Sequence, residues 1–175
     1  MELLECVLEI DDIDAFVSQL GEIGERHDVT IQAFDASYVA GRAHLERAVE
    51  LADRAIARGE NVARDRAVEI LLYAAGRRQI DDALEMGVGE GRHRAVILVD
   101  GSSTGNEGVQ EGKAAAALET LGELDAVVRT EPTLEPRDEA TLCAFFEITD
   151  AEREATDASL AALVRERVVL LEVDK

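Results

Sequence analysis

The residues Ala95–Val99 (AVILV) form an unbroken apolar run, which constrains the fold more than any other segment. The run predicts a buried strand, because a half-exposed strand would alternate apolar with polar residues. Such a strand needs a hydrophobic core, and a chain of 175 residues is long enough to build one. The chain has four Phe, two Tyr and no Trp, so this core must consist mainly of Leu, Val, Ile and Ala.

Helical and strand patterns alternate along the rest of the chain. Strands are predicted at residues 2–10, 29–34 and 126–129. Apolar residues spaced three and four apart predict helices at residues 42–58, 61–86 and 109–121, and Gly76 should break the second of these. We therefore expect one α/β (α+β) domain, residues 1–175, with a small mixed β-sheet flanked by several helices.

Short signals refine the helix ends. Asp11 or Asp12 can cap a first helix, and Gly59 suits the end of helix 42–58. Thr149 and Glu152 form a capping box, and Asp157 can cap the helix that follows. Periodicity leaves residues 168–173 open as a strand or a terminal helix. The stripes expected to face inward are Ile13, Phe16, Val17, Leu20 and Ile23 in the first helix and Leu45, Ala48, Val49, Ala52 and Ile56 in helix 42–58.

The chain is strongly acidic, with 38 acidic residues against 18 basic ones and a formal net charge of −20. Only Lys113 and Lys175 are lysines. An acidic excess with scarce lysine is typical of adaptation to molar salt, where charges are screened within ~3 Å. The alternative is an acidic protein kept soluble by self-repulsion. We favour a halophilic protein.

No segment indicates export or a membrane span. Glu2 and Glu5 occupy positions where a signal peptide carries positive charge. No apolar run approaches the ~20 residues that cross a membrane. Cys6 and Cys143 form neither a CxxC motif nor a zinc spacing, so we predict two buried thiols in a reducing compartment. The sequence thus predicts a cytoplasmic protein without membrane contact.

The Gly/Ser-rich loop 101–108 is the main candidate for chemistry, because backbone amides of such a loop can hold phosphate before a helix. The phosphate-loop pattern fails, since Ala114 follows Lys113 and Glu107 replaces the first Gly. The match to a calcium loop is only partial. No metal-ligand spacing exists among His27, His44 and His93.

We therefore expect no catalytic residues, no metal site and no cofactor. Two alternatives remain open beside a non-catalytic adaptor. One is a small nucleotide- or metal-binding enzyme that uses the loop Gly101–Gly108. The other is a dimeric ligand-binding module.

Residues 42–94 hold ten Arg and ten acidic residues, so the rest of the chain carries the whole net charge of −20. In an acidic protein such a neutral, Arg-rich stretch is a natural surface for an anionic partner. The alternative is helical ion pairs such as Glu50 with Arg54. On a continuous helix, Tyr73 beside Arg77 would offer single-stranded RNA bases a ring and a guanidinium. Their stripe would comprise Arg66, Glu69, Tyr73, Arg77 and Ile80.

Several segments together resemble one family. They are GRAHL at 41–45, EILLYAAGRRQI at 69–80, FEITD at 146–150 and LVRERVVLL at 163–171. The family is the small kinase-binding (PRPK-binding, TPRKB-like) subunit of the KEOPS complex, here of a haloarchaeal type. The resemblance covers almost the whole chain. Asp35 and Val169 depart from it, because Asn and Ala are expected there.

The resemblance implies a non-catalytic subunit of the complex that installs threonylcarbamoyl on adenosine 37 of tRNA. It implies that the subunit binds the N-terminal lobe of a small atypical kinase, supports its activity and helps to recruit tRNA through the 3′ CCA end. The candidate tRNA-binding residues are Arg64, Arg66, Tyr73, Arg77, Arg78, Gln79 and Ile80. The candidate kinase-binding residues are Leu163, Val164, Val168 and Leu170, with helix 42–58 as a second candidate.

Overall fold

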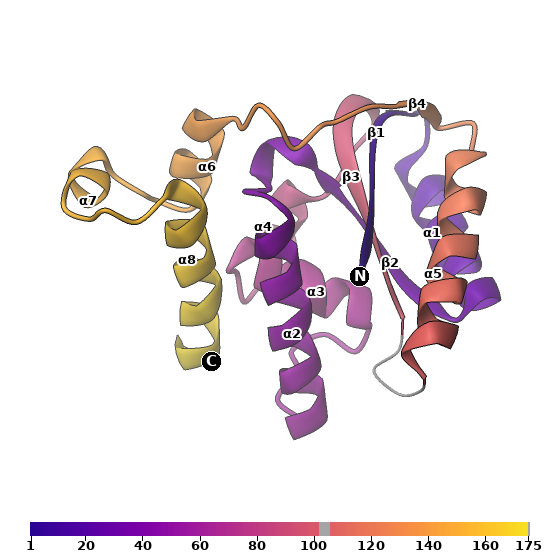
Figure 1. Ribbon diagram of the computed structural model, residues 1–175, viewed down its shortest axis with the longest axis horizontal. Coiled ribbons are helices and arrows are strands. Elements are labelled where there is room, and N and C mark those ends of the chain that lie inside the picture. The colour runs from indigo at the N-terminus through magenta and orange to yellow at the C-terminus, as the bar shows by residue number, and fades with distance from the viewer. Residues whose placement is uncertain (102–105, 175) are drawn as a thin grey trace. The chain divides into compact units, whose positions relative to one another are not determined.

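The computed structural model describes residues 1–101 and 106–174. The chain forms two compact units, whose elements are labelled in Figure 1. Met1–Ala36 and Gly87–Thr133 form the first, called here the sheet unit. Ser37–Met86 and Leu134–Lys175 form the second, the helical unit.

Four strands make up the sheet of the first unit: β1 (Glu2–Ile10), β2 (Val29–Asp35), β3 (Gly91–Gly101) and β4 (Val127–Thr130). Their order is β2-β3-β1-β4, and the three pairings between neighbours are antiparallel. In the longest ladder Glu2 pairs with Val99 and Ile10 with Gly91. The expected α/β class is confirmed, but the expectation of a mixed sheet is wrong, because these pairings include no parallel one.

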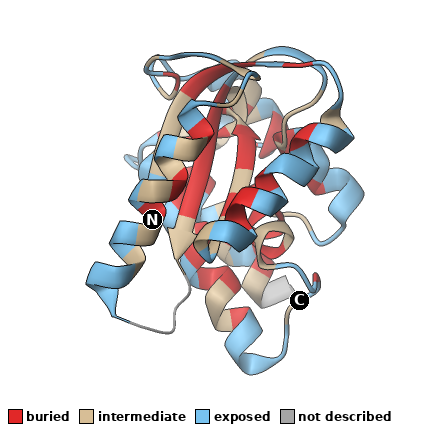
Figure 2. Ribbon diagram, turned by 90° about the vertical axis from the view of Figure 1, so that its right-hand side faces the viewer, coloured by how far each residue is buried: buried red, intermediate tan, exposed pale blue. Residues whose placement is uncertain are grey.

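Two helices of the sheet unit, α1 (Ile13–His27) and α5 (Glu107–Gly122), pack against the sheet. The core that they form with the strands is aliphatic except for Cys6 and Phe16, as the scarcity of aromatics predicts. Every residue of Ala95–Val99 is 0% exposed, which confirms the buried strand. Figure 2 shows the buried residues concentrated on the strands. The helical members of the core are Phe16, Leu20 and Ile23 from α1 and Ala114, Ala117 and Leu121 from α5.

The helical unit contains the longer helices α2 (Arg42–Arg58), α3 (Arg66–Ala75) and α8 (Leu160–Asp174). Contacts of α2 with α3 and α8, and of α3 with α8, hold these three together. The short helices α4 (Ile80–Ala83), α6 (Glu139–Phe145) and α7 (Asp150–Glu154) complete the unit. There are also two 3-10 turns: in the sequence η1 (Ala36–Tyr38) precedes α2, and η2 (Leu84–Met86) follows α4.

Most predicted helix ends are confirmed. Asp12 caps α1, Gly59 ends α2 in the left-handed conformation, and Thr149 accepts a hydrogen bond from the Glu152 backbone at the start of α7. Asp157 does not cap the next helix; Ser159 does, because its hydroxyl accepts from Ala162 N at 3.2 Å. Residues 168–173 are helical.

Three other expectations need correction. The helix expected from Asn61 begins at Arg66, because Asp65 caps it by accepting from two backbone amides of the first turn. Val17 and Ile56 were expected to face inward, yet they are 56% and 37% exposed. Both lie at the margins of stripes whose central residues already fill the core. Helix α6 was not predicted.

Candidate functional site

The turn between α3 and α4 fixes the position of Arg77. Gly76 ends α3 with a φ of 62° and donates its N–H to Tyr73 O. Arg77 N donates to Leu72 O at 3.0 Å, which completes a Schellman motif. A Cβ on Gly76 would lie 3.4 Å from Arg167 O, so this position has little room for a side chain. Helix α3 therefore ends before Arg77, and the turn at Gly76 directs the chain away from the helix at Arg77.

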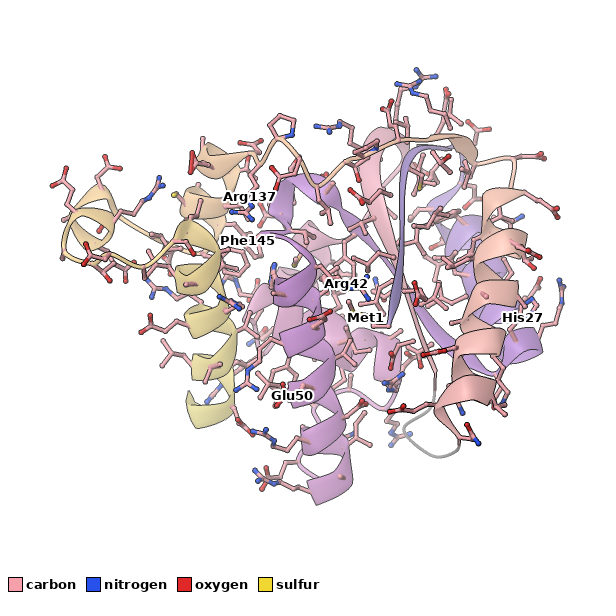
Figure 3. All side chains as sticks on the ribbon, viewed as in Figure 1. Met1, His27, Arg42, Glu50, Arg137 and Phe145 are labelled. Carbon is pink, nitrogen blue, oxygen red and sulfur yellow. The ribbon has the colours of Figure 1, made fainter. Side chains whose placement is uncertain are left out.

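The Arg77 guanidinium lies over the ring of Phe145, which Figure 3 labels on α6. Its guanidinium carbon lies 4.4 Å from the centre of the Phe145 ring, and Nη2 donates to Phe145 O. Tyr38 and Phe146 pack edge-on against the same ring, with centroid distances of 5.1 and 4.9 Å. The contact with the Phe145 ring and the hydrogen bond to Phe145 O together restrict the rotation of the guanidinium.

Two pockets of the helical unit share Arg77 and Glu147 in their walls. The larger, of about 670 Å³, is called here the Phe145 pocket, and the smaller, of about 280 Å³, the Arg167 pocket. The other residues of the Phe145 pocket are Tyr38, Glu85, Thr141, Ala144 and Phe145. The other residues of the Arg167 pocket are Gly76, Arg78, Phe146, Arg167, Leu170 and Leu171.

Arg167 on α8 anchors the segment that borders both pockets. Its Nε donates to Phe146 O at 3.1 Å and its Nη2 to Glu147 O at 3.3 Å. The same Nη2 lies 2.7 Å from each carboxylate oxygen of Glu152 on α7. One side chain therefore ties α8 both to α7 and to the backbone that follows α6.

His44 ties α2 to the end of α3. Its Nδ1 accepts from Ala40 N at 3.1 Å, so the ring proton is on Nε2, which donates to Ala74 O at 2.8 Å. Burial lowers the pKa of His44 to about 4, although the bond to Ala74 acts in the opposite direction. The neutral ring packs edge-on against Phe146 with a centroid distance of 5.6 Å.

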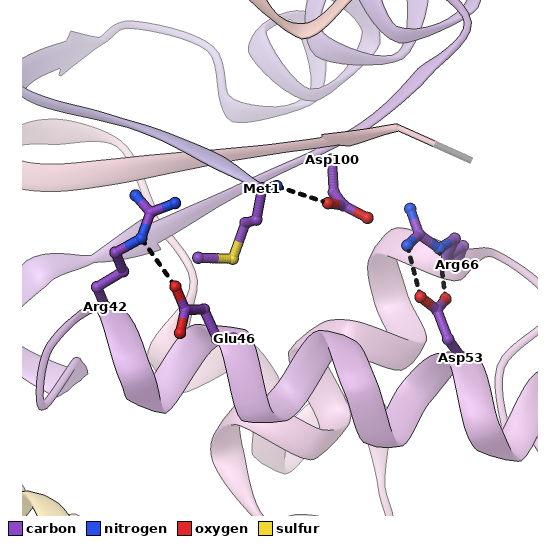
Figure 4. A network of polar contacts seen from close by, with 6 residues as sticks. All are labelled: Met1, Arg42, Glu46, Asp53, Arg66 and Asp100. Atoms are coloured by element: carbon purple, nitrogen blue, oxygen red, sulfur yellow. Dashed lines mark hydrogen bonds and ion pairs between the residues drawn. The ribbon is translucent and has the colours of Figure 1, made fainter. Parts of the chain in front are cut away.

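Ion pairs within and between helices engage much of the neutral stretch 42–94. Figure 4 shows two of them, Arg42 with Glu46 at 2.8 Å and Arg66 with Asp53 through two parallel hydrogen bonds. Glu50 lies between Arg47 and Arg54, so the alternative of helical pairs is correct here. Arg58 contacts Glu172, and in the sheet unit Arg92 contacts Glu9. These arginines neutralise neighbouring carboxylates.

The candidate tRNA-binding residues fall into three environments. Arg66 pairs with Asp53, and Tyr73 is 1% exposed. The role of Tyr73 as a stacking platform is therefore wrong in this structure: α3 ends at Ala75, and its ring faces the core. Arg77 lines both pockets. Exposed positions hold the others, which are Arg64, Arg78, Gln79 and Ile80.

Arg64 and Arg78 differ from the other arginines of the stretch. Among residues 1–101 and 106–174, neither side chain has a hydrogen bond or an ion pair. Arg78 also lines the Arg167 pocket, next to Arg77. Arg77 and Arg78 are thus two adjacent arginines, neither of which has a carboxylate partner among the described residues. In a chain with a net charge of −20, they form a local cationic site.

Most candidate kinase-binding residues are part of the core of the helical unit. Leu163, Val164 and Val168 are 4%, 0% and 0% exposed, since α8 turns them toward its neighbours. Leu170 is 42% exposed and borders the Arg167 pocket. Of the four, Leu170 alone has a large exposed surface.

The remaining candidates for chemistry are the loop Gly101–Gly108 and the metal-ligating and thiol side chains. Residues 102–105 of the loop Gly101–Gly108 lie outside the described residues. In the part of the chain that is described, His, Cys, Asp and Glu form no group of three or more that could hold a metal ion. Over the same residues, no helix combines the length and apolar character needed to cross a bilayer. Cys6 is buried as expected, but Cys143 is half-buried.

The α+β fold with two pockets around one immobilised arginine has the character of a binding protein. The family model described as kinase binding protein CGI-121 matches residues 9–172, and the chain belongs to this family. The search of curated proteins found no match.

Sequence reasoning missed the partners that make the site. Phe145 was not a candidate, and Glu147 and Arg167 belonged only to the segments FEITD and LVRERVVLL that carry the family resemblance. Phe145 is 68 residues from Arg77 in the chain, so no local periodicity connects them. One signal was available: Glu147 follows a short apolar segment, Phe145–Phe146, in a very acidic chain.

Proposed function

We propose that the chain is a non-catalytic accessory subunit of the KEOPS complex, which modifies adenosine 37 of tRNA with threonylcarbamoyl. In this proposal it binds a small atypical kinase and helps to recruit tRNA through the 3′ CCA end. Membership of the kinase binding protein family supports the first partner. The halophilic assignment belongs to the same proposal and rests on the acidic, Lys-poor composition. The cytoplasmic assignment is part of the proposal as well.

The observation that carries the tRNA part is the cationic site at Arg77 and Arg78. These residues lie at the turn between α3 and α4, and no carboxylate pairs with either of them among the described residues. In molar salt, phosphate contacts lose strength because counterion release yields little. Binding must then depend on stacking and on base edges, for which a planar guanidinium is suited.

The tRNA part is tested by filter binding in molar potassium chloride, with intact tRNA and with tRNA lacking its CCA end. Intact tRNA should bind more tightly. Arg77→Ala and Arg78→Ala should each weaken binding of the intact form. Arg129→Ala is the matched control, because Arg129 is equally cationic but lies on β4 and pairs with Glu131. Equal affinity for the two RNAs would contradict the proposal.

The kinase part is tested by a pull-down from native lysate at high salt, followed by identification of the bound proteins. We expect the kinase to co-purify and Leu170→Glu to release it, because an exposed apolar side chain on α8 suits an interface anchor. Val109→Glu is the control, since Val109 is 55% exposed but lies on α5 of the sheet unit. Retention of the kinase by the folded Leu170→Glu variant would place the contact elsewhere.

A further inference from the structure

The walls of the Phe145 pocket contain both kinds of charge without an internal ion pair. The Arg77 guanidinium lies over the Phe145 ring and donates a hydrogen bond to the Phe145 carbonyl. Among the described residues, no carboxylate pairs with it. Glu85 and Glu147 are exposed, and over the same residues neither carboxylate has a hydrogen bond or an ion pair. A cation and two anions that share a pocket but do not pair remain available to a polar ligand.

Glu147 occupies a backbone position at the end of α6 where Gly is usually found. Its φ is 54°, in the left-handed region, and Ile148 N donates to Cys143 O at 2.9 Å to close the end of α6. Gly is the usual residue at such a helix end, because a Cβ is strained there. Residues that break a local rule often do so at a functional site. Glu147, which adopts the left-handed conformation without being Gly, borders both pockets.

We propose that Arg77 is the stacking platform for one base of the bound RNA, and that Glu85 and Glu147 favour a base with an exocyclic amino group. This inference rests on the proposed function and names the residues that give it specificity. Phe145 covers one side of the guanidinium, and Arg77 is part of the wall of both pockets. Arginine planes stack on unpaired bases much as aromatic rings do.

The chemistry of the two carboxylates determines which bases are accepted. A carboxylate accepts hydrogen bonds and donates none, so it matches the amino group of cytosine or adenine. Uracil has the acceptor O4 where cytosine has its amino group, so a carboxylate that binds the amino group would repel uracil at that position. Arg78 is exposed beside the smaller pocket and next to Arg77. A CCA end consists of amino-bearing bases and therefore fits this site.

The test compares tRNA ending in CCA with the same tRNA ending in UUU, by filter binding in molar potassium chloride. Wild-type protein should prefer the CCA end at least about fivefold, the lower range for one stacked and paired base. The double variant Glu85→Gln with Glu147→Gln should bind both RNAs alike, because an amide also donates to uracil oxygens. Both side chains are exposed, so this variant should fold normally.

A second arm separates the plane of Arg77 from its charge. Arg77→Lys keeps the charge but removes the planar surface, so it should weaken binding of the CCA end at least about fivefold. Arg129→Lys is the matched control and should bind like wild type, because Arg129 lies on β4 outside the site and pairs with Glu131. Suppose that wild type binds intact tRNA more tightly than tRNA lacking CCA. This inference alone is then overturned if the double Gln variant still prefers tRNA ending in CCA to tRNA ending in UUU. It is also overturned if Arg77→Lys binds the CCA end as tightly as wild type does. If wild type ignores the CCA end, the proposed function fails together with it.

Discussion

Arg167 places a single nitrogen, Nη2, 2.7 Å from both carboxylate oxygens of Glu152. The two side chains come from α8 and α7 and are 24% and 33% exposed. The Arg167 guanidinium also donates to the carbonyls of Phe146 and Glu147. It is therefore the centre of a small network rather than one half of an isolated surface pair.

This network predicts unequal effects for its two partners. Glu152→Gln removes one partly exposed ion pair and should lower the free energy of unfolding by about 0.5–1 kcal/mol. Arg167→Ala also removes a charged donor from two carbonyls and should lower it by about 2–3 kcal/mol. Urea unfolding measures both. Arg165→Ala on the same helix is the control, because Arg165 is exposed and should change the value little. Equal losses for Glu152→Gln and Arg167→Ala would contradict the network.

His44 should make stability depend on pH below neutrality. The ring is 1% exposed, and burial lowers its pKa from 6.5 to about 4. In the unfolded chain His44 takes up a proton near pH 6.5, whereas the folded protein resists this until about pH 4. Stability is thus fully present above pH 6.5 and is lost as the pH falls toward 4, by about 3 kcal/mol in total.

The measurement for His44 is the free energy of unfolding between pH 7 and pH 4, for wild type and for His44→Gln. The variant should be less stable at pH 7, because the amide replaces the ring imperfectly between Ala40 and Ala74. Its decline with acid should be shallower, since the titrating group is gone. Parallel curves for the two proteins would show that His44 does not cause the decline.

Apolar spacing located the elements, because burial of one stripe or one strand leaves a periodic trace. The bounds of β1 and α2 agree with the predicted ranges, and Gly76 ends α3 as expected. Helix α6 was missed because it spans only seven residues, too few for a stripe to repeat. The antiparallel pairing also depends on contacts distant in sequence.

The site was predictable only in part. Composition pointed to Arg77 and Arg78, since they lie in the neutral stretch of an acidic chain. The helical periodicity placed Tyr73 and Arg77 on one stripe, but it could not show which of the two side chains faces the core. With α3 ending at Ala75, the ring of Tyr73 is buried while Arg77 packs on Phe145. The sequence thus indicated Arg77, whereas its contact with Phe145 became visible only in the fold.

The two cysteines should differ in reactivity. Cys6 is 0% exposed within the sheet unit, and burial raises the pKa of its thiol to about 11. Cys143 on α6 is half-buried, with Arg153 Nη1 3.9 Å from its sulfur. A thiol reagent at pH 8 should label one cysteine in the native protein and both in denaturant. Cys143→Ser should abolish the native reaction; persistence of the reaction would show that Cys6 is accessible.

The isolated chain should be catalytically inert and should bind ATP no better than millimolar. The loop 101–108 lacks the phosphate-loop pattern. Calorimetry in molar potassium chloride, with and without magnesium, measures this affinity. A micromolar dissociation constant would favour the nucleotide-binding alternative over a pure adaptor.

Stability should rise with salt, because 38 acidic residues repel one another when they are unscreened. Many of the arginines already pair with neighbouring carboxylates, so most of the uncompensated acidic charge lies outside residues 42–94. The melting temperature should therefore fall between molar and ~50 mM potassium chloride, where the screening length exceeds 10 Å. If residues 1–175 form one cooperative domain, calorimetry should show a single transition at each salt concentration. Sodium sulfate at equal ionic strength is the control, since it also strengthens hydrophobic burial and should stabilise the protein further. A melting temperature that stays constant or rises as salt is removed would contradict the halophilic assignment.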